Sequence, residues 1–182
     1  MSLVVSVYIA TSLDGFIARE NGELDWLDAA SNTVTEGEDC GYAAFMDSVD
    51  VLVMGRNTYE KVLSLGDWPY QDKPVIVLSS KQLNIPDSIS DTVSLSGESP
   101  EELYSRLSHE GVKRIYIDGG IAIQGFLSAG LVNDITITLI PILLGRGKRL
   151  FGALESDILL KHVRTESYEF GFVQVVYEVE KI

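Results

Sequence analysis

Short runs of consecutive hydrophobic residues recur along the first two thirds of the chain and predict buried β-strands. The runs occupy residues 4–10, 51–55, 74–79 and 114–118 and are rich in β-branched side chains. Strands that are apolar on both faces are typical of a parallel sheet covered by helices on both sides. We therefore predict such a sheet from this part of the chain.

The segments between these runs carry helix signals. The clearest begins at Ser99, which forms a capping box with Glu102 and is followed by Pro100 at the first helical position. Asn57 and Glu60 repeat the capping pattern more weakly, and the apolar residues after a double glycine predict a third helix up to residue 129. Alternating strands and helices indicate an α/β fold.

The pattern changes after residue 134, where long strands follow one another without intervening helices. These strands are predicted at residues 135–140, 158–167 and 172–180. The last one alternates between two sets of side chains, which indicates a strand covered mainly on one face. We predict an α/β fold whose mostly parallel central sheet carries antiparallel strands at its C-terminal edge.

The composition supports one compact domain over residues 1–182. Hydrophobic residues make up 46% of the chain, and no Pro-, Gly- or Ser-rich linker divides it. A chain of this length can bury about 70% of the surface that it exposes when unfolded. That is enough for a full hydrophobic core.

Acidic residues outnumber basic ones by 27 to 14, so the formal net charge is −13. Such a charge repels nucleic acid and anionic membrane surfaces. An anionic ligand must therefore be held by local basic groups, which makes the few arginines and lysines near the predicted strand ends informative.

Cysteine and histidine are too scarce to suggest a metal centre. Cys40 is the only cysteine, so neither an internal disulfide nor a four-thiolate zinc site can form, and His109 and His162 stand in unrelated contexts. The N-terminus lacks the basic segment of a signal peptide, and the longest apolar run, residues 135–144, is too short to span a bilayer. We expect a cytoplasmic protein without a metal ion.

Three of the predicted strands end in glycine or hydroxyl residues. Gly55 ends one strand, Ser79 and Ser80 follow the next, and Gly119 and Gly120 follow the third. Glycine lets the backbone approach a phosphate closely, and the free N–H groups and dipole of a following helix favour negative charge there. Together the three ends predict a nucleotide-phosphate site, although a double glycine alone is equally well explained as a turn.

With these strand ends, residues 10–18 (Ala-Thr-Ser-Leu-Asp-Gly-Phe-Ile-Ala) resemble the dihydrofolate reductase superfamily. Residues 139–151 (Leu-Ile-Pro-Ile-Leu-Leu-Gly-Arg-Gly-Lys-Arg-Leu-Phe) resemble the branch typified by the reductase domain of the bifunctional riboflavin-pathway deaminase-reductase. The resemblance covers nearly the whole chain. It implies a three-layer dihydrofolate-reductase-like fold, NADPH as cofactor and a homodimer.

The resemblance also implies which residues bind NADPH. The backbone of Ala10 would contact the nicotinamide carboxamide, and Ile17 would pack near the ring. The pyrophosphate would lie on the backbone of Gly119, Gly120, Ile121, Ala122 and Ile123. The adenosine phosphate would meet Gly55, Arg56, Asn57, Thr58, Ser79, Ser80 and Lys81.

Charge favours NADPH over NADH. Arg56 with the hydroxyls of Ser79 and Ser80 and the ammonium of Lys81 offers the donors that a 2′-phosphate needs. Neither strand end carries the acidic residue that an NAD-type site places on the ribose. In isolation, Arg56 would be interpreted as a solvated charge at a helix start.

The resemblance extends to the substrate side of the site. Residues 11–28 would form a mobile loop over the nicotinamide, with Trp26 shaping the pocket, and an ordinary surface loop is the alternative. Reduction of a C=N bond needs a proton donor. A gapless count back from residue 54 places the acid of the folate enzymes at Asp39, where the local composition also favours an acid. Arg146 and Lys148 would bind a substrate phosphate, unless they belong to a solvated loop.

These observations predict an NADPH-dependent reductase that transfers hydride to a small heterocyclic or sugar-phosphate substrate. The nearest activity by resemblance is the 5-amino-6-(5-phosphoribosylamino)uracil reductase of riboflavin biosynthesis, in a stand-alone form. Lys73 stands where folate enzymes carry an arginine that forks onto the substrate's tail, which disfavours folate. The alternatives are a dihydrofolate reductase and a non-catalytic nucleotide-binding protein.

Overall fold

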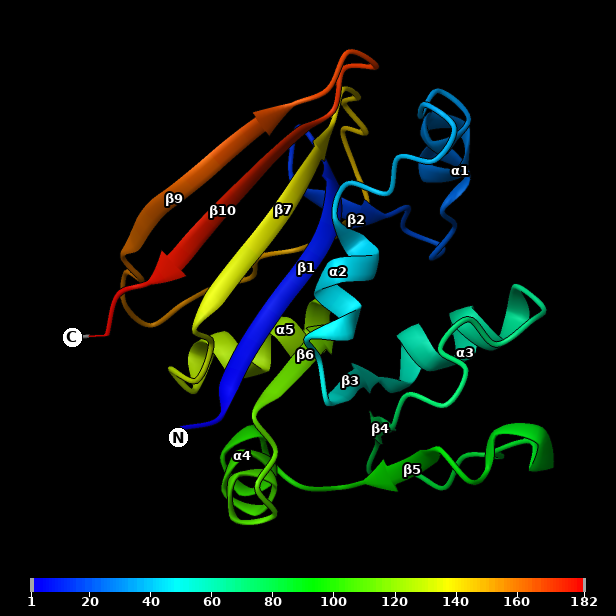
Figure 1. Ribbon diagram of the computed structural model, residues 1–182, viewed down its shortest axis with the longest axis vertical. Helices are drawn as coiled ribbons and strands as arrows, with labels where there is room; N and C mark the ends of the chain where they lie inside the picture. The colour runs from blue at the N-terminus through cyan, green and yellow to red at the C-terminus, as the bar shows by residue number, and fades with distance from the viewer. Residues whose placement is uncertain (1, 182) are drawn as a thin grey trace.

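The computed structural model describes residues 2–181, which form an eight-stranded sheet with helices on both faces (Figure 1). The order across the sheet is β5-β4-β3-β6-β1-β7-β10-β9. The strands are β1 (Val4–Ser12), β3 (Val51–Gly55), β4 (Val75–Leu78), β5 (Val93–Ser96), β6 (Arg114–Asp118), β7 (Asp134–Ile140), β9 (Leu160–Ser167) and β10 (Val173–Val179). A separate two-stranded sheet pairs β2 (Phe16–Ala18) with β8 (Lys148–Arg149).

The strands from β5 to β7 in this order are parallel, whereas β10 runs antiparallel to both β7 and β9. The predicted α/β fold with antiparallel C-terminal strands is confirmed. Because all the parallel strands point the same way, the carboxyl ends of β1, β3, β4 and β6 meet at one edge of the sheet.

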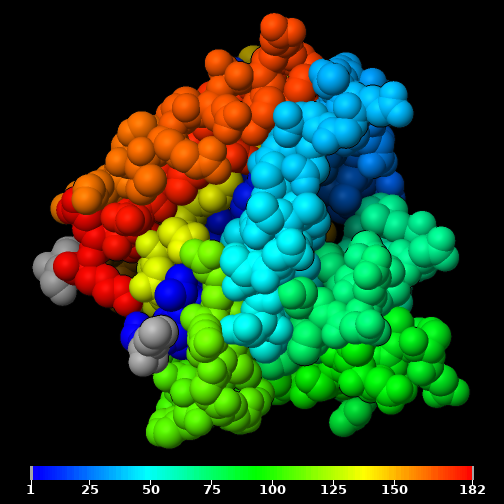
Figure 2. Space-filling view, in the orientation of Figure 1, coloured from blue at the N-terminus to red at the C-terminus, as the bar shows by residue number. Residues whose placement is uncertain are grey.

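Two helices cover each face of the parallel strands. α4 (Pro100–His109) and α5 (Gly120–Ser128) pack on one face, and α2 (Tyr42–Asp47) and α3 (Arg56–Ser64) pack on the other. α1 (Asp25–Ser31) packs near the end of β7, and a 3-10 turn (Asp87–Ile89) precedes β5. In Figure 2 the segment with α1 and α2 crosses the visible face of the molecule.

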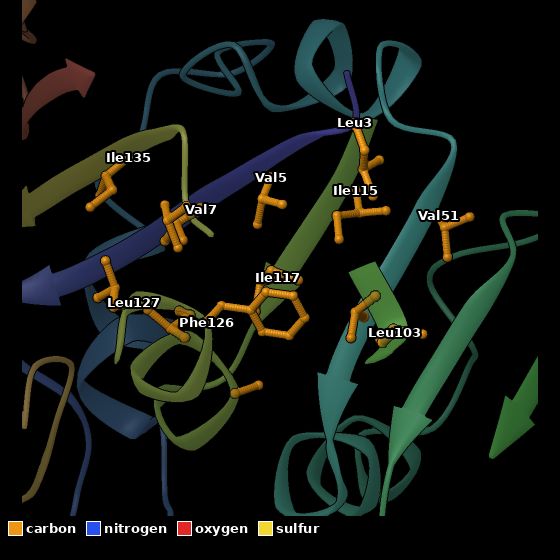
Figure 3. Close-up of a cluster of buried hydrophobic side chains, with 14 of the residues drawn as sticks. Leu3, Val5, Val7, Val51, Leu103, Ile115, Ile117, Phe126, Leu127 and Ile135 are labelled. Atoms are coloured by element: carbon orange, nitrogen blue, oxygen red, sulfur yellow. The ribbon is translucent and has the colours of Figure 1, made fainter. Parts of the chain in front are cut away.

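Alternate side chains of the parallel strands enter two hydrophobic cores. Val5 and Val7 point toward Phe126 of α5 in the first core (Figure 3). Met54 packs with Tyr59 of α3 in the second. Both faces of these strands are therefore buried, which is why their sequences are continuous apolar runs.

The edge strand β9 is not covered in the same way. All of its residues, Leu160–Ser167, are exposed. Among residues 2–181, no helix is both long and apolar enough to cross a membrane.

The capping prediction for α4 is confirmed, and that for α3 is wrong. Ser99 accepts a hydrogen bond from the Glu102 N–H, and the Glu102 carboxylate accepts one from the Ser99 N–H. In contrast, α3 begins at Arg56 without a side-chain cap, and Glu60 forms an ion pair with Arg56 instead of capping the helix. An i,i+4 pair of opposite charge is well placed to form on a helix surface.

The segment predicted as a loop over residues 11–28 has regular structure. β1 continues to Ser12, β2 follows after a turn, and α1 begins at Asp25. The carboxylate of Asp14 stabilises this turn because it accepts hydrogen bonds from the Ser12 hydroxyl and from the N–H groups of Leu144 and Gly145. These three donors hold the pKa of Asp14 down at about 2, with the Ser12 hydroxyl as the largest cause.

Candidate active site

A large cleft opens at the carboxyl ends of the parallel strands. Its volume is about 1600 Å³, and its walls come from β1, β3, β4 and β6, from α1 and α3, and from the β2–β8 pair. Pockets that hold one small ligand measure about 300–1,000 Å³. This cleft has room for a dinucleotide and a second small molecule.

The strand ends that the sequence singled out all meet at this cleft. The predicted cofactor residues that line it are Ala10, Ile17, Gly55, Arg56, Asn57, Thr58, Ser79, Ser80, Lys81, Gly119, Gly120, Ile121 and Ala122. Ile123 does not line it, because its side chain is fully buried in the core beneath α5.

Gly119 and Gly120 lie so close to neighbouring segments of the chain that side chains at these positions would meet other atoms. Gly119 has a positive φ of 92°, and a β-carbon there would overlap the side chain of Thr58. A β-carbon on Gly120 would lie 2.9 Å from Ile17 Cδ1 and 3.2 Å from the carbonyl oxygen of Arg149. Glycine is therefore required at position 119 by both conformation and space.

Two of the helices that start at the cleft, α3 and α5, have no N-cap side chain to bond their first N–H groups, and the Gly119 N–H donates to the Asp118 carboxylate. Neither Gly55, the N-cap of α3, nor Gly119, the N-cap of α5, provides a side-chain hydrogen bond, whereas α4 has its complete capping box. Free N–H groups and the helix dipole make such helix starts suitable for phosphate. A cradle of glycine backbone and two uncapped helices fits the phosphates of a dinucleotide.

Basic side chains stand beside this cradle. Arg56 lies at the first position of α3 and pairs with Glu60 at 2.8 Å, with both side chains partly exposed. Lys81 follows β4, where the Ser79 hydroxyl accepts a hydrogen bond from the Lys81 N–H and donates one to its carbonyl oxygen. These cations are where the resemblance places the adenosine phosphate.

Only part of the basic segment after β7 lies at the cleft. Lys148 and Arg149 line the cleft on β8, next to β2 and the double glycine, whereas Arg146 does not line it. The Arg149 guanidinium lies 4.7 Å from the centre of the Phe16 ring, in a cation–π contact. The structure therefore separates Arg146 from Lys148, which the sequence analysis had assigned to one phosphate site.

Trp26 does not reach the cleft. Its side chain is 3% exposed and packs with Ile140 and Phe172, while the next residue of α1, Leu27, lines the cleft. The prediction that Trp26 shapes the pocket directly is therefore corrected to a role in positioning α1. The sequence predicted a loop over residues 11–28, so the apolar face of the short helix α1 was not recognised.

Asp39 lines the cleft but is poorly suited to donate a proton. Its carboxylate accepts hydrogen bonds of 2.8 Å from the N–H groups of Gly41 and Ala43, at the start of α2. These bonds stabilise the ionised form and lower the pKa of Asp39, with the Ala43 N–H as the largest cause. The exposed carboxylate therefore acts as a cap for α2.

Asp118 is the acidic residue that the sequence analysis missed. It ends β6 directly before Gly119, lines the cleft and accepts a hydrogen bond of 2.9 Å from the Gly119 N–H. Burial raises the pKa of this carboxyl to about 6. The strand period places the Asp118 side chain on the same face as Tyr116, away from Ile115 and Ile117, but it does not show that this carboxyl is desolvated.

No group of three or more histidine, cysteine, aspartate or glutamate side chains could hold a metal ion among residues 2–181. His109 and His162 each contact a neighbour on their own element, the carbonyl of Ser105 and the hydroxyl of Thr165.

Comparison with known proteins gives consistent relatives. Residues 4–173 match the family model of the RibD C-terminal domain. The chain is 38% identical over 166 residues to the uncharacterized protein YwjB of Bacillus subtilis (strain 168), covering 89% of this chain and 90% of that protein. It is 29% identical over 178 residues to YyaP of the same organism, covering 93% and 91%.

Solved structures share the fold. A protein from Shewanella sp. PV-4, provisionally described as a riboflavin biosynthesis protein, superposes with a TM-score of 0.91 and 41% identity over 98% of this chain and 100% of that one. The diaminohydroxyphosphoribosylaminopyrimidine deaminase/5-amino-6-(5-phosphoribosylamino)uracil reductase of Thermotoga maritima gives a TM-score of 0.74 with 15% identity, over 98% of this chain and 57% of that one. At that identity the likeness concerns the fold alone.

Proposed function

The chain belongs to the RibD C-terminal domain family, and we propose on that premise that it is a reductase that transfers hydride from NADPH to a small heterocyclic or sugar-phosphate substrate. The observation that carries the proposal is the position of Asp118. A partly buried carboxyl whose pKa is raised to about 6 directly precedes the glycine cradle proposed for the cofactor phosphates. A group of this pKa can hold or release a proton near neutral pH.

The cofactor would be held by three segments. The backbone of Gly119 to Ala122 would take the pyrophosphate, Arg56 with Ser79 to Lys81 would take the 2′-phosphate, and Ala10 and Ile17 would flank the nicotinamide. When bound there, NADPH would supply the hydride. Although the protein has a net charge of −13, it can hold this anion, because four basic residues line the cleft, namely Arg56, Lys81, Lys148 and Arg149.

The protein's own contribution to the reaction is position, exclusion of water and a proton. The β2–β8 pair and α1 wall the cleft on one side, and Asp14 ties the turn before β2 to residues 144 and 145. Asp118 is the group that would hold or supply the proton at the substrate nitrogen. Trp26 and Asp39 support the walls of the cleft through α1 and α2.

Among known activities, the 5-amino-6-(5-phosphoribosylamino)uracil reductase reaction is the nearest that family membership suggests. The contacts of Lys73 disfavour a dihydrofolate reductase. The Lys73 ammonium donates hydrogen bonds to the carbonyl oxygens of Met46 and Val49 at the end of α2, so the protein itself occupies this group. A nucleotide-binding protein without catalysis would use the same cradle but would not need Asp118.

Oxidation of NADPH, followed by its absorbance, tests the proposal with dihydrofolate and 5-amino-6-(5-phosphoribosylamino)uracil side by side. We expect turnover with the uracil compound, and loss of turnover in Asp118→Asn with retained NADPH binding. Binding of NADPH without turnover of any heterocycle would favour the non-catalytic alternative. Absence of NADPH binding would contradict the proposal altogether.

We also propose that two copies pair through the uncovered C-terminal sheet. β9 is exposed along its whole length, and Leu160 and Val163 on it are 40% and 49% exposed. Exposed edge strands are ready to pair with another chain. Light scattering after size exclusion should give twice the mass of the chain, and a monomer at micromolar concentration would contradict this.

A further inference from the structure

Strand β10 carries a buried amide side chain. Gln174 is 1% exposed, and it is the only asparagine or glutamine among the buried side chains of residues 2–181. A buried amide costs free energy unless its N–H groups and its oxygen are hydrogen-bonded. The partners of Gln174 therefore indicate what this side chain does in the fold.

Both ends of the Gln174 amide have partners. Its Nε2 atom donates to the carbonyl oxygen of Cys40 at 2.9 Å, to the hydroxyl of Tyr8 at 3.0 Å and to the hydroxyl of Thr138 at 3.2 Å. Its Oε1 atom accepts a hydrogen bond of 3.3 Å from Nη2 of Arg164 on β9. Because a guanidinium only donates, this last contact fixes which end of the amide is the oxygen. The amide thus ties β1, β7 and β9, its neighbours in the sheet (Figure 1), to the segment before α2.

Two donors converge on the Cys40 carbonyl oxygen, because the Tyr8 hydroxyl also donates to it. Cys40 has a φ of 54°, and the next residue, Gly41, has a φ of 83°. A residue with a side chain adopts this left-handed conformation at a cost, and it persists where surrounding contacts fix it. Hydrogen bonds from β1 and β10 to one carbonyl group supply such contacts. We call this pair of donors, Gln174 and Tyr8, the carbonyl clamp.

The carbonyl clamp holds a wall of the cleft. Asp39, Cys40 and Tyr42 line the cleft, and α2 begins at Tyr42 with Gly41 as its N-cap. The Tyr42 ring meets the Tyr8 ring edge-on, with ring centres 5.8 Å apart. Movement of the Cys40 carbonyl would therefore displace the start of α2 and the Tyr42 ring. The 39–42 segment is separate from the three segments proposed to hold the cofactor.

We propose that Gln174 is a positioning residue, which together with Tyr8 holds the 39–42 wall of the cleft in place through the Cys40 carbonyl. Gln174 itself does not line the cleft, so it acts on the site only through the residues that it holds. That this wall faces the substrate rests on the proposed reductase function. That the amide holds the wall does not.

The thiol of Cys40 reports directly on this wall. Cys40 is the only cysteine of the chain, and burial raises the pKa of its thiol, which slows its reaction with a disulfide reagent. The reaction with 5,5′-dithiobis(2-nitrobenzoate) at about pH 8, near the ordinary pKa of a thiol, measures how often the wall opens. Gln174→Met keeps the length of the side chain and removes the amide. We expect its thiol to react at least fivefold faster, the scale of one lost hydrogen bond, and a smaller change would overturn the proposal.

Two control variants separate release of the wall from general damage. Thr136 lies on the same face of β7 as Thr138, is 7% exposed and makes no hydrogen bond to Gln174 or Cys40. Thr136→Val should leave the thiol rate within twofold of the unchanged protein. Ile115→Val in the first core lowers stability by about as much as one lost hydrogen bond and should also leave the rate within twofold. If either control accelerates the reaction as much as Gln174→Met does, the proposal is overturned.

Tyr8→Phe provides a second test if Gln174→Met does not fold. It keeps the ring of Tyr8 and removes the hydroxyl that donates to Cys40 and accepts from Gln174. The Cys40 thiol should react at least threefold faster in this variant. A smaller change would overturn the proposal that the carbonyl clamp holds the wall.

Steady-state kinetics with NADPH and 5-amino-6-(5-phosphoribosylamino)uracil test the positioning role in the reaction. Gln174→Met should raise KM for the uracil compound at least fivefold and change KM for NADPH less than twofold, because only one wall is released. A rise in KM for the uracil compound that is no larger than the rise for NADPH would overturn the positioning role. If neither protein turns over this compound or dihydrofolate, the proposed reductase function fails, while the thiol rates still decide whether Gln174 holds the wall.

Discussion

Gly119 lies directly against Thr58, so that a β-carbon at position 119 would overlap the Thr58 Oγ1 atom. This contact joins the turn after β6 to the first turn of α3. The two segments contribute neighbouring walls of the proposed cofactor cradle, and the distance between them is set by the absence of a side chain at residue 119.

Gly119→Ala should therefore widen the cradle. The added methyl group forces Thr58 and the start of α3 outward, and it also strains a backbone with φ of 92°. We expect at least a tenfold loss of NADPH affinity in calorimetry, with an unchanged circular dichroism spectrum.

Gly111→Ala is the matched control for that experiment. Gly111 has a similar φ of 83°, but its β-carbon would meet open space, and it does not line the cleft. It should lower stability and leave NADPH affinity unchanged. Equal loss of affinity in both variants would show that backbone strain, and not the contact with Thr58, determines the effect.

Arg56 should discriminate between the two nicotinamide cofactors. Its guanidinium stands at the start of α3 and is partly exposed, with Glu60 as its present partner. Arg56→Ala should weaken NADPH by about 1.5–3 kcal/mol, the scale of a hydrogen bond to a charged group, and NADH much less. Titration of both nucleotides measures the difference.

Glu60→Gln serves as the control for Arg56. It removes the carboxylate that competes with a phosphate for the guanidinium, so NADPH should bind equally well or more tightly. Equal losses of NADPH and NADH affinity in Arg56→Ala would remove Arg56 from the 2′-phosphate site.

The sequence predicted the parallel strands well, because a strand that is buried on both faces consists almost entirely of apolar residues. The runs at β1, β3, β4 and β6 have no other simple explanation, and the glycine and hydroxyl residues at their ends share one edge by topology. β5 (Val93–Ser96) was missed because it is only four residues long and two of them are serines. Such a short run is hard to separate from a loop.

The choice of acid shows where linear counting fails. Asp39 was selected by a gapless offset, but short insertions change such an offset without changing the fold. What separates Asp118 from Asp39 is the environment: desolvation raises the pKa of the partly buried Asp118 carboxyl, whereas the exposed Asp39 carboxylate accepts two backbone N–H groups. Desolvation depends on tertiary packing, which local sequence does not reveal.

The structure also separates the basic residues that the sequence grouped. Lys148 lies on the cleft and Arg146 does not, although only Gly147 separates them, because β8 pairs with β2 only through Lys148 and Arg149. Lys148→Ala should weaken NADPH about three- to fivefold at low salt, as expected for one partly screened charge. Arg146→Ala should have no effect. Calorimetry in 50 mM and 300 mM salt, concentrations chosen to vary the screening of charges, measures the NADPH affinity of both variants. Equal losses of affinity in Lys148→Ala and Arg146→Ala would contradict the assignment of Lys148, and not Arg146, to the cleft.

Asp118 should make the unliganded protein less stable as the pH rises from about 4 to about 6. Burial raises its pKa to about 6 in the folded chain, above its ordinary value of 3.8, so the folded state holds this proton where the unfolded state has lost it. Ionisation in the folded chain then costs up to about 3 kcal/mol, at about 1.4 kcal/mol per unit of pKa. Asp118→Asn removes this cost, and its advantage in unfolding free energy over the unchanged protein should be larger at pH 7 than at pH 4.

Asp39→Asn should show the opposite dependence in the same urea-unfolding experiment. Hydrogen bonds from Ala43 and Gly41 lower the pKa of Asp39, so its stabilising contribution is present above its ordinary pKa and is lost as the pH falls through the lowered value. The variant should therefore be less stable than the unchanged protein at pH 7, and the difference should shrink toward acid pH. Two carboxyl groups in one cleft would then report opposite environments. If both variants shift stability with the same sign between pH 4 and pH 7, Asp118 is not the desolvated, proton-holding group on which the proposed chemistry depends.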